Sequence, residues 1–223
     1  MDKELLKQGL VKIIAGFIIL CLLIFVPAGT IHFRYGWLFM AVLFIPMVLA
    51  GAVMLKKSPE LLRKRLNSKE KESEQKEVVR LSGLMFLTTF IVAGLNYRFG
   101  WIRMPSWLVY SFAVIFLISY AMFWEVMREN EYLSRTVEIQ QNQKVVDTGL
   151  YGIVRHPMYA VTVFLFLSMP LVLGSPVSFV IMLAYIPIIA KRIHNEEEVL
   201  EKGLEGYSEY KKKVRYRLVP FIW

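Results

Sequence analysis

Two short polar motifs beside apolar segments contain the residue types of this chain that are best able to do chemistry. The first spans residues 149–159 and holds Arg155, His156 and two tyrosines. The second spans residues 191–197 and holds Arg192 with two glutamates. Charged groups next to membrane-like apolar segments are costly to desolvate, so such groups indicate a functional site. An arginine there can hold an anion, and a glutamate can hold a cation or accept a proton.

The spacing of these residues predicts that they meet in one pocket. Pro157 suits the first turn of a helix, where free backbone N–H groups can meet an anion. Arg192 and Glu196 are four residues apart and therefore share one helix face. A helical hairpin between the motifs brings both of them to the same end. The predicted pocket residues are Arg155, His156, Tyr159, Arg192 and Glu196.

Each of these residues alone has a simpler interpretation. Lys191 and Arg192 are also explained as positive anchors at a membrane surface, and residues 196–198 as a solvated helix start. Glu125, near the end of another apolar segment, either faces the same cavity or pairs with Arg128. The conjunction of both motifs at the two ends of one hairpin favours the pocket.

Sequence patterns of soluble cofactor and metal sites are absent. The chain has no GxGxxG, P-loop, GxSxG, HExxH or CxxC pattern. With three histidines and one cysteine, we expect no metal site. Cys21, inside an apolar run, can form no disulfide within the chain.

Composition places the chain among membrane proteins, because 56% of its 223 residues are hydrophobic. A membrane helix needs about 20 mostly apolar residues. Four segments approach this length and two shorter ones follow them. The six segments are residues 10–27, 36–55, 79–99, 107–127, 158–173 and 177–190. Between the last two, Gly174, Ser175 and Pro176 can end one helix, cap the next and open it, which predicts a tight helical hairpin.

The basic residues predict an orientation in the membrane. Of the 27 Lys and Arg residues, Arg34, Arg98 and Arg103 fall on one side and the others belong to the opposite side. The positive-inside rule then places both termini in the cytoplasm, which six spans satisfy. This topology and contact with anionic lipids explain the net charge of +9, so we do not expect nucleic-acid binding.

The predicted fold is an all-α integral membrane protein with about six transmembrane or membrane-embedded helices, of which the last two form the hairpin, and a cytoplasmic C-terminal helix. Residues 1–128 are expected to form a four-helix transmembrane region with a cytoplasmic loop at 56–79. Residues 129–223 are expected to form a cofactor-binding catalytic region around the hairpin at 158–190.

Two cytoplasmic segments carry more local predictions. Ser58-Pro59-Glu60 has the residue types of a helix start and precedes a short apolar face, which predicts an interfacial helix. Residues 67–77 are expected to form a solvated loop. Residues 196–210 have the apolar spacing of one helix.

The two polar motifs resemble those of the isoprenylcysteine carboxyl methyltransferase family, a group of integral membrane enzymes related to phospholipid methyltransferases. The resemblance rests on the RHPxY motif at 155–159, on Arg192-x-x-x-Glu196-Glu197 and on residues 207–220. It covers residues 130–223 closely, whereas the first four spans match as a hydrophobic pattern. Ala160 in place of a glycine, and Leu204-Glu205-Gly206 in place of Phe-Gly, depart from the family pattern.

The resemblance implies S-adenosyl-L-methionine (SAM) as cofactor, bound on the cytoplasmic side without a Rossmann domain. It implies that Arg192 binds the substrate carboxylate and that Arg155 binds an anion or shapes the pocket. If the acceptor is an amine, it must lose a proton, and Glu197 or Glu196 is then the base. The implied cofactor contacts are Gln140, Gln143, Lys144, Val145, Val146, Tyr151, His156, Pro157, Met158, Tyr159 and Glu196.

The expected function is O-methylation of the carboxylate of a prenylcysteine-like or other lipophilic acceptor. A carboxylate is already anionic, so the protein must align and desolvate it rather than deprotonate it. The alternatives left open are N-methylation of an amine or phospholipid, lipid reduction by NADPH, and a non-enzymatic membrane role. The expected partners are membrane lipids and a lipophilic or lipidated substrate, without nucleic acid or an obligate protein partner. The expected location is the plasma membrane of a prokaryote.

Overall fold

A computed structural model describes residues 3–66, 73–130, 132–133, 137 and 139–223, and it is helical with no strand in these ranges. The helices are α1 (Lys3–Ala28), α2 (Arg34–Lys57), α3 (Pro59–Leu66), α4 (Ser73–Phe99), α5 (Ser106–Glu129), α6 (Pro157–Val172), α7 (Pro176–Met182), α8 (Tyr185–Gly203) and α9 (Tyr207–Lys213). A 3-10 turn, η1 (Gly149–Gly152), precedes α6.

Five stretches of helix are long and apolar enough to cross a membrane. These are α1, α2, residues Gln75–Phe99 of α4, α5, and the combined α7–α8 stretch Pro176–Gly203. Helix α6 is apolar as well, but it has only 16 residues. The predicted all-helical membrane fold is therefore confirmed, and each predicted apolar segment is mostly helical.

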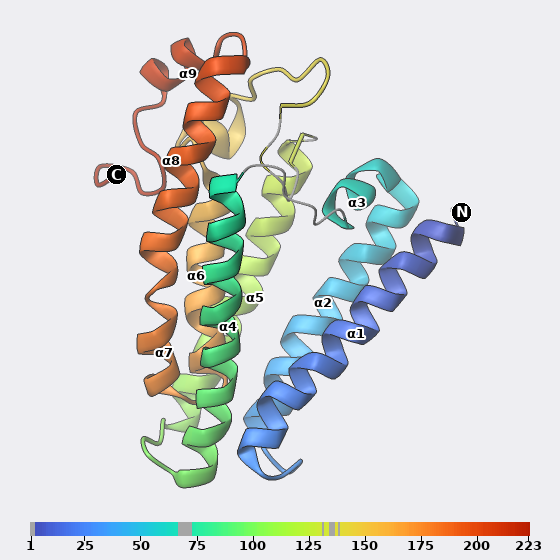
Figure 1. Cartoon of the computed structure of the whole chain (residues 1–223), viewed down its shortest axis with the longest axis vertical. Coiled ribbons are helices and arrows are strands. Elements are labelled where there is room, and N and C mark those ends of the chain that lie inside the picture. The colour runs from blue at the N-terminus through green and yellow to red at the C-terminus, as the bar shows by residue number, and fades with distance from the viewer. Residues whose placement is uncertain (1–2, 67–72, 131, 134–136, 138) are drawn as a thin grey trace.

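The helices form a bundle with a tilted pair beside it. Figure 1 shows α4, α5, α6 and α7–α8 running side by side, with α1 and α2 leaning against one end of them. The two parts join closely at Gly94 of α4, where an added Cβ would lie 2.6 Å from the carbonyl oxygen of Ile24 in α1. Large buried rings such as Phe39 and Phe116, 6.2 Å apart, fill the interior between α2 and α5.

The predicted hairpin is present between α6 and α7. Gly174 adopts a left-handed φ of +70°, which glycine tolerates without steric cost. The Ser175 hydroxyl accepts a hydrogen bond from the Ser178 backbone N–H at 3.3 Å, and Pro176 is the first residue of α7. The second arm is then interrupted after Met182 and continues as α8, well beyond the predicted end at residue 190.

Two of the local predictions need correction, and a third is confirmed. The loop expected at 67–77 is helical from Ser73 onward, since α4 begins there, and residues 67–72 lie outside the described ranges. The helix expected at 196–210 breaks after Gly203, because Leu204 has extended backbone angles and Gly206 a left-handed φ of +81°. The predicted helix start at Ser58 is correct, as its carbonyl oxygen accepts the Leu62 N–H at 3.2 Å.

Both polar motifs lie at one end of the bundle. Figure 1 places the N-terminal end, α3 and α9 at this same end, together with the loop that joins α5 to η1. The hairpin therefore does what the sequence predicted for the site, because it returns α8 to the level at which α6 begins.

Candidate active site

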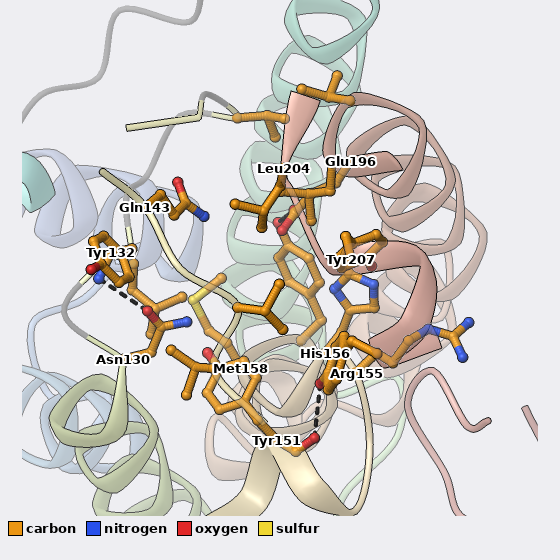
Figure 2. A pocket seen from close by; sticks show the side chains of 18 of the residues that line it. Asn130, Tyr132, Gln143, Tyr151, Arg155, His156, Met158, Glu196, Leu204 and Tyr207 are labelled. Atoms are coloured by element: carbon orange, nitrogen blue, oxygen red, sulfur yellow. Dashed lines mark hydrogen bonds between the residues drawn. The ribbon is translucent and has the colours of Figure 1, made fainter. Parts of the chain in front are cut away.

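A cavity opens where α5, α6, α8 and α9 meet the loop after α5. Its empty volume is about 860 Å³, part of which is open to solvent. Figure 2 shows Tyr151, His156 and Met158 from one side of it and Glu196, Leu204 and Tyr207 from the other. Of the predicted site residues, the cavity is lined by Gln143, Lys144, Val145, Val146, Tyr151, Arg155, His156, Met158, Tyr159, Arg192 and Glu196.

Helix α8 presents a cation and an anion to this cavity. Arg192 and Glu196 lie one turn apart on its cavity-facing side, as their spacing predicted. The Tyr159 hydroxyl links them, since it donates to Glu196 Oε2 and accepts from Arg192 Nε at 2.9 Å. One wall of the cavity therefore holds a guanidinium and a carboxylate in a fixed arrangement.

The neighbouring Glu197 has a different environment. It does not line the cavity and is 2% exposed, because it continues the buried face of α8 made by Tyr185, Ile189 and Ile193. Its Oε1 accepts from Arg155 Nε at 2.8 Å and lies 3.2 Å from His156 Nε2.

Its other oxygen, Oε2, accepts from Nε of Arg217 at 3.0 Å and lies 2.9 Å from another nitrogen of the same guanidinium. Two arginines and a histidine therefore surround one carboxylate. An anion held in this way orients its partners and is poorly placed to accept a proton from a ligand.

The C-terminal segment after α9 completes the same network. One terminal nitrogen of Arg155 donates to the carbonyl oxygens of Val214 and Arg215, each at 2.8 Å. The backbone N–H of Arg155 donates to the Tyr216 carbonyl oxygen, and that of His156 to the Arg217 carbonyl oxygen, each at 2.9 Å. The motif before α6 is thereby held by a segment about 60 residues later, which leaves Arg155 in a pocket-shaping role.

Two further predicted residues lie outside the cavity lining. Gln140 donates from its side-chain amide to the Tyr132 carbonyl oxygen at 2.5 Å, and its backbone N–H donates to Gln143 Oε1 at 2.9 Å. It therefore shapes the loop rather than facing the cavity. Pro157 is the first residue of α6 and has the N-terminal position that its sequence context predicted.

Two lining tyrosines have hydroxyls without a hydrogen-bond partner. Tyr151 and Tyr207 are 7% and 4% exposed, and neither hydroxyl forms a hydrogen bond within the described part of the chain. The Tyr151 side chain lies beside Asn130. The backbone carbonyl oxygen of Tyr151 accepts a hydrogen bond from the Tyr210 hydroxyl at 2.8 Å. Burial raises the pKa of both Tyr151 and Tyr207, so they stay neutral. Buried polar groups normally have partners, so these hydroxyls are suited to a ligand.

A tight turn positions Tyr151. Gly149 has a φ of +52°, and the carboxylate of Glu129 accepts the Leu150 N–H at 3.0 Å immediately after it. A Cβ at residue 149 would lie 1.7 Å from Glu129 Oε1, so a larger residue would displace this carboxylate and would also be strained by the left-handed φ. The end of α5 is thus tied to the start of η1.

The alternatives raised for the other charged residues are resolved by their contacts. Glu125 pairs with Arg128, with Nε to Oε2 at 2.9 Å, and does not line the cavity. Lys191 lies 2.5 Å from Glu77 of α4, so it binds two helices together. Within the described residues, no group of three His, Cys, Asp or Glu side chains has the arrangement of a metal site.

Several lining residues were not predicted. Val199 and Leu200 lie one turn after Glu196 on α8. From the sequence they were predicted to belong to an apolar helix face, without a role in the site. The signal was available, because positions 192, 196, 199 and 200 share one face of an α-helix. The lining residues missed from the sequence are Asn130, Tyr132, Leu133, Val137, Val199, Leu200, Leu204, Tyr207 and Tyr210.

Comparison with known proteins gives a match to a family model and a similarity to a solved structure. Residues 108–202, which include α6, most of α8 and both polar motifs, match the family model of the isoprenylcysteine carboxyl methyltransferase (ICMT) family. The chain is also similar to the solved structure of the eukaryotic intramembrane Ras methyltransferase ICMT. That similarity has 18% sequence identity, covers 85% of this chain and 74% of that chain, and has a TM-score of 0.49. No curated protein matches the chain.

Proposed function

We propose that this chain is a membrane methyltransferase that uses SAM to O-methylate the carboxylate of a prenylcysteine-like or other lipophilic acceptor. The match of residues 108–202 to the family model of the isoprenylcysteine carboxyl methyltransferase family supports this proposal. One observation carries the proposal. The cavity wall holds Arg192 and Glu196 side by side through Tyr159, while Glu197 is fully engaged behind the wall. The cavity thus offers a site for a carboxylate without offering an unengaged base.

The residues present fit SAM. Glu196 is a carboxylate suited to the ammonium group of the methionine part, and Lys144 is suited to its carboxylate. The Tyr207 hydroxyl has no hydrogen-bond partner among the described residues and the Tyr151 hydroxyl lies beside Asn130, and both suit the ribose or adenine. An apolar wall suits the faces of adenine, and it consists of Leu133, Val145, Val146, Val199, Leu200 and Leu204.

The charge of the cavity favours an anionic acceptor. Among the described lining residues, Glu196 is the single carboxylate, and Tyr159 donates to it. Arg155 pairs with Glu197, and two further cationic side chains, Arg192 and Lys144, line the space. An amine acceptor would be repelled by these cations and would need a base. A carboxylate is attracted by them and needs none.

In the proposed reaction, SAM supplies an activated methyl group on a sulfonium whose sulfur leaves as a neutral thioether. Arg192 would hold one oxygen of the acceptor carboxylate and would leave the other oxygen free to accept that methyl group. No proton is released, so atoms and charges balance without a base. Tyr159 fixes the Arg192 guanidinium, and the apolar wall limits water, which would compete for the carboxylate charge.

We propose that the cavity faces the cytoplasm and that both termini lie on that side. Support comes from the distribution of basic residues and from the position of the N-terminal end, α3 and α9 at the same end of the bundle (Figure 1). The acceptor's lipid part then reaches the site from the adjacent leaflet. We also keep the earlier expectation that the membrane is the plasma membrane of a prokaryote.

Equilibrium binding of SAM to the detergent-purified protein tests the cofactor. We expect saturable binding that Glu196→Gln weakens at least ten-fold. The matched control is Glu198→Gln, since Glu198 is on the same helix but is exposed and pairs with His194 at 3.2 Å. Equal SAM affinity of both variants would remove the role given to Glu196. Binding of NADPH without SAM would indicate a reductase, and binding of neither by a folded sample would favour a non-enzymatic role.

Methyl transfer from labelled SAM tests the acceptor. We expect transfer to an N-acylated prenylcysteine carboxylate and none to its carboxamide or to a phosphatidylethanolamine. Arg192→Ala should abolish transfer but retain most of the SAM affinity, whereas Lys191→Ala on the neighbouring position should retain transfer. Methylation of the amine headgroup, with the carboxylate inert, would replace the O-methylation proposal by N-methylation.

A further inference from the structure

The segment after α9 ends in a turn with unusually exposed apolar side chains. Phe221 is 87% exposed and Ile222 is 81% exposed, and both follow Pro220. The backbone turn is closed by hydrogen bonds from the N–H groups of Arg217 and Leu218 to the Trp223 oxygen, at 2.9 and 3.0 Å. The turn is thus ordered by its own backbone, and its apolar tip is directed away from the protein.

Phe221 also has an unfavourable backbone conformation. Its φ is +66°, a region in which residues with a Cβ are uncommon and strained. Its ring contacts Tyr216 at a centroid distance of 5.3 Å, but the side chain remains almost fully exposed. Contacts within the protein therefore do not explain why this strained, exposed position is held by a phenylalanine.

The turn lies at the level where the apolar part of the bundle ends. Leu218 packs against a buried cluster that includes Tyr185, Ile189 and Ile193 of α8. Along α8 the apolar run ends at Ala190, and Lys191 and Arg192 follow. Figure 1 shows the C-terminal end beside α8, nearer to the middle of the bundle than α9 is. The tip of the turn is thus placed at the boundary between acyl chains and headgroups.

The segment that carries the apolar tip also contains exposed positive charges. Lys212 and Arg215 are exposed and form no salt bridge with any described residue. The neighbouring Lys211 and Lys213 are engaged by Glu201 and Asp147. A segment that combines an apolar tip with exposed cations has the composition of surfaces that bind anionic membranes.

We propose that residues 212–223 form a lipid-binding surface, in which Phe221 and Ile222 insert into the leaflet beside the cavity and Lys212 and Arg215 contact anionic headgroups. A protein partner is less well supported, because the tip lies at the bilayer boundary and is small. In the bilayer, insertion removes the exposed rings and chains from water, which offsets the strain at Phe221.

This surface is connected to the cavity through the backbone. The carbonyl oxygens of Val214 to Arg217 hold Arg155 and His156, and Arg217 holds Glu197. Anchoring of the tip in the bilayer therefore stabilises the wall of the cavity. Binding of a ligand in the cavity then depends on the bilayer. This consequence rests on the proposed function, whereas lipid insertion does not.

Fluorescence quenching by lipids tests the insertion. In a Cys21→Ser background, an environment-sensitive probe is attached at Phe221→Cys or, separately, at Ile222→Cys, and the protein is reconstituted in phosphatidylcholine vesicles containing phosphatidylglycerol. The matched control is Glu205→Cys, which is exposed at the same end of the bundle. Lipids carrying a nitroxide near the headgroup should quench both tail probes several-fold more strongly than the control probe. Equal quenching at all three positions, with equal access of aqueous iodide, would overturn the proposal.

A second experiment separates this proposal from the proposed function. SAM binding is measured in vesicles for the wild type and for the Phe221→Ser/Ile222→Ser double variant, with Glu205→Ser as control. We expect several-fold weaker binding by the double variant alone. Quenched tail probes together with an unchanged SAM affinity would retain the lipid surface and remove the coupling. Quenched tail probes with no SAM binding by the wild type would contradict the proposed cofactor alone.

Discussion

The buried carboxylate of Glu197 gives the sharpest test of how the site is built. Its side chain and that of Arg155 are 3% and 5% exposed, and the pair is joined at 2.8 Å. In the Glu197→Ala variant the arginine stays buried without its counter-charge. Removing one partner of a buried ion pair costs about 3–5 kcal/mol in unfolding free energy. For a chain of this size, about 2–4 °C of melting temperature corresponds to each kcal/mol, so we expect a decrease of about 6–20 °C.

Thermal unfolding in a fixed detergent or lipid mixture measures this effect, with Glu198→Ala as the matched control. Glu198 is the next residue of α8, is 52% exposed and pairs with His194 and Lys202 at the surface. Exposed pairs of this kind contribute about 0–1 kcal/mol, so the control should unfold within a few degrees of the wild type. If Glu197→Ala were as stable as Glu198→Ala, the buried network would not hold the motif before α6, and the reasoning would be refuted.

The Glu197→Gln variant then distinguishes a positioning residue from a general base. Glutamine keeps the shape and one acceptor oxygen, but it lacks the charge that attracts Arg155 and Arg217. For a positioning residue, SAM affinity and thermal stability should decrease together, and turnover should keep its pH profile. A general base would show the opposite pattern, with normal stability and SAM affinity but no turnover.

Two further substitutions, at Gly149 and Tyr207, and the pH dependence of stability have expected outcomes. Gly149→Ala puts a Cβ 1.7 Å from Glu129 Oε1 at a φ of +52°, so we expect the free energy of unfolding to decrease by about 1–3 kcal/mol, measured by thermal unfolding. The control Gly83→Ala has open space around the added Cβ and should cause no decrease. Tyr207→Phe removes a hydroxyl that has no partner among the described residues, so stability at neutral pH should be unchanged. Equilibrium binding should show a decrease of about 2–12-fold in SAM affinity. An unchanged affinity would exclude this hydroxyl from the ligand site. Burial raises the pKa of Tyr207, so its contribution to stability should be intact at neutral pH and be lost as pH rises above about 10, where the unfolded tyrosine ionises. A melting-temperature profile should therefore decline less steeply at high pH in Tyr207→Phe than in the wild type.

Local chemistry made the hairpin and one cavity wall predictable from the sequence. The turn depends on three consecutive residues, Gly174, Ser175 and Pro176, and each has its preferred conformation there. The wall depends on a spacing of four residues within one helix, which fixes Arg192 and Glu196 on one face. Neither feature needs information from distant parts of the chain.

Features that depend on distant contacts were not predictable in the same way. Arg217 comes 62 positions after Arg155, and no local pattern connects it to the network of Glu197. The break after Gly203 was missed because the apolar spacing continues through Leu204 and Tyr207, although the chain turns at Gly206 to bury both. The division of the chain near residue 128 remains a prediction.

The two adjacent glutamates show how one helix separates binding from support. Consecutive residues of an α-helix point about 100° apart, so Glu196 and Glu197 cannot face the same space. Glu197 falls in register with Tyr185, Ile189 and Ile193, which form the buried face, and Glu196 falls in register with Arg192 on the cavity face. The buried carboxylate of Glu197 pairs with Arg155 and anchors the C-terminal segment, and the half-buried carboxylate of Glu196 faces the cavity, where a ligand can reach it. The described part of the cavity is thereby left with more positive than negative side chains, which is the balance that an anionic acceptor requires.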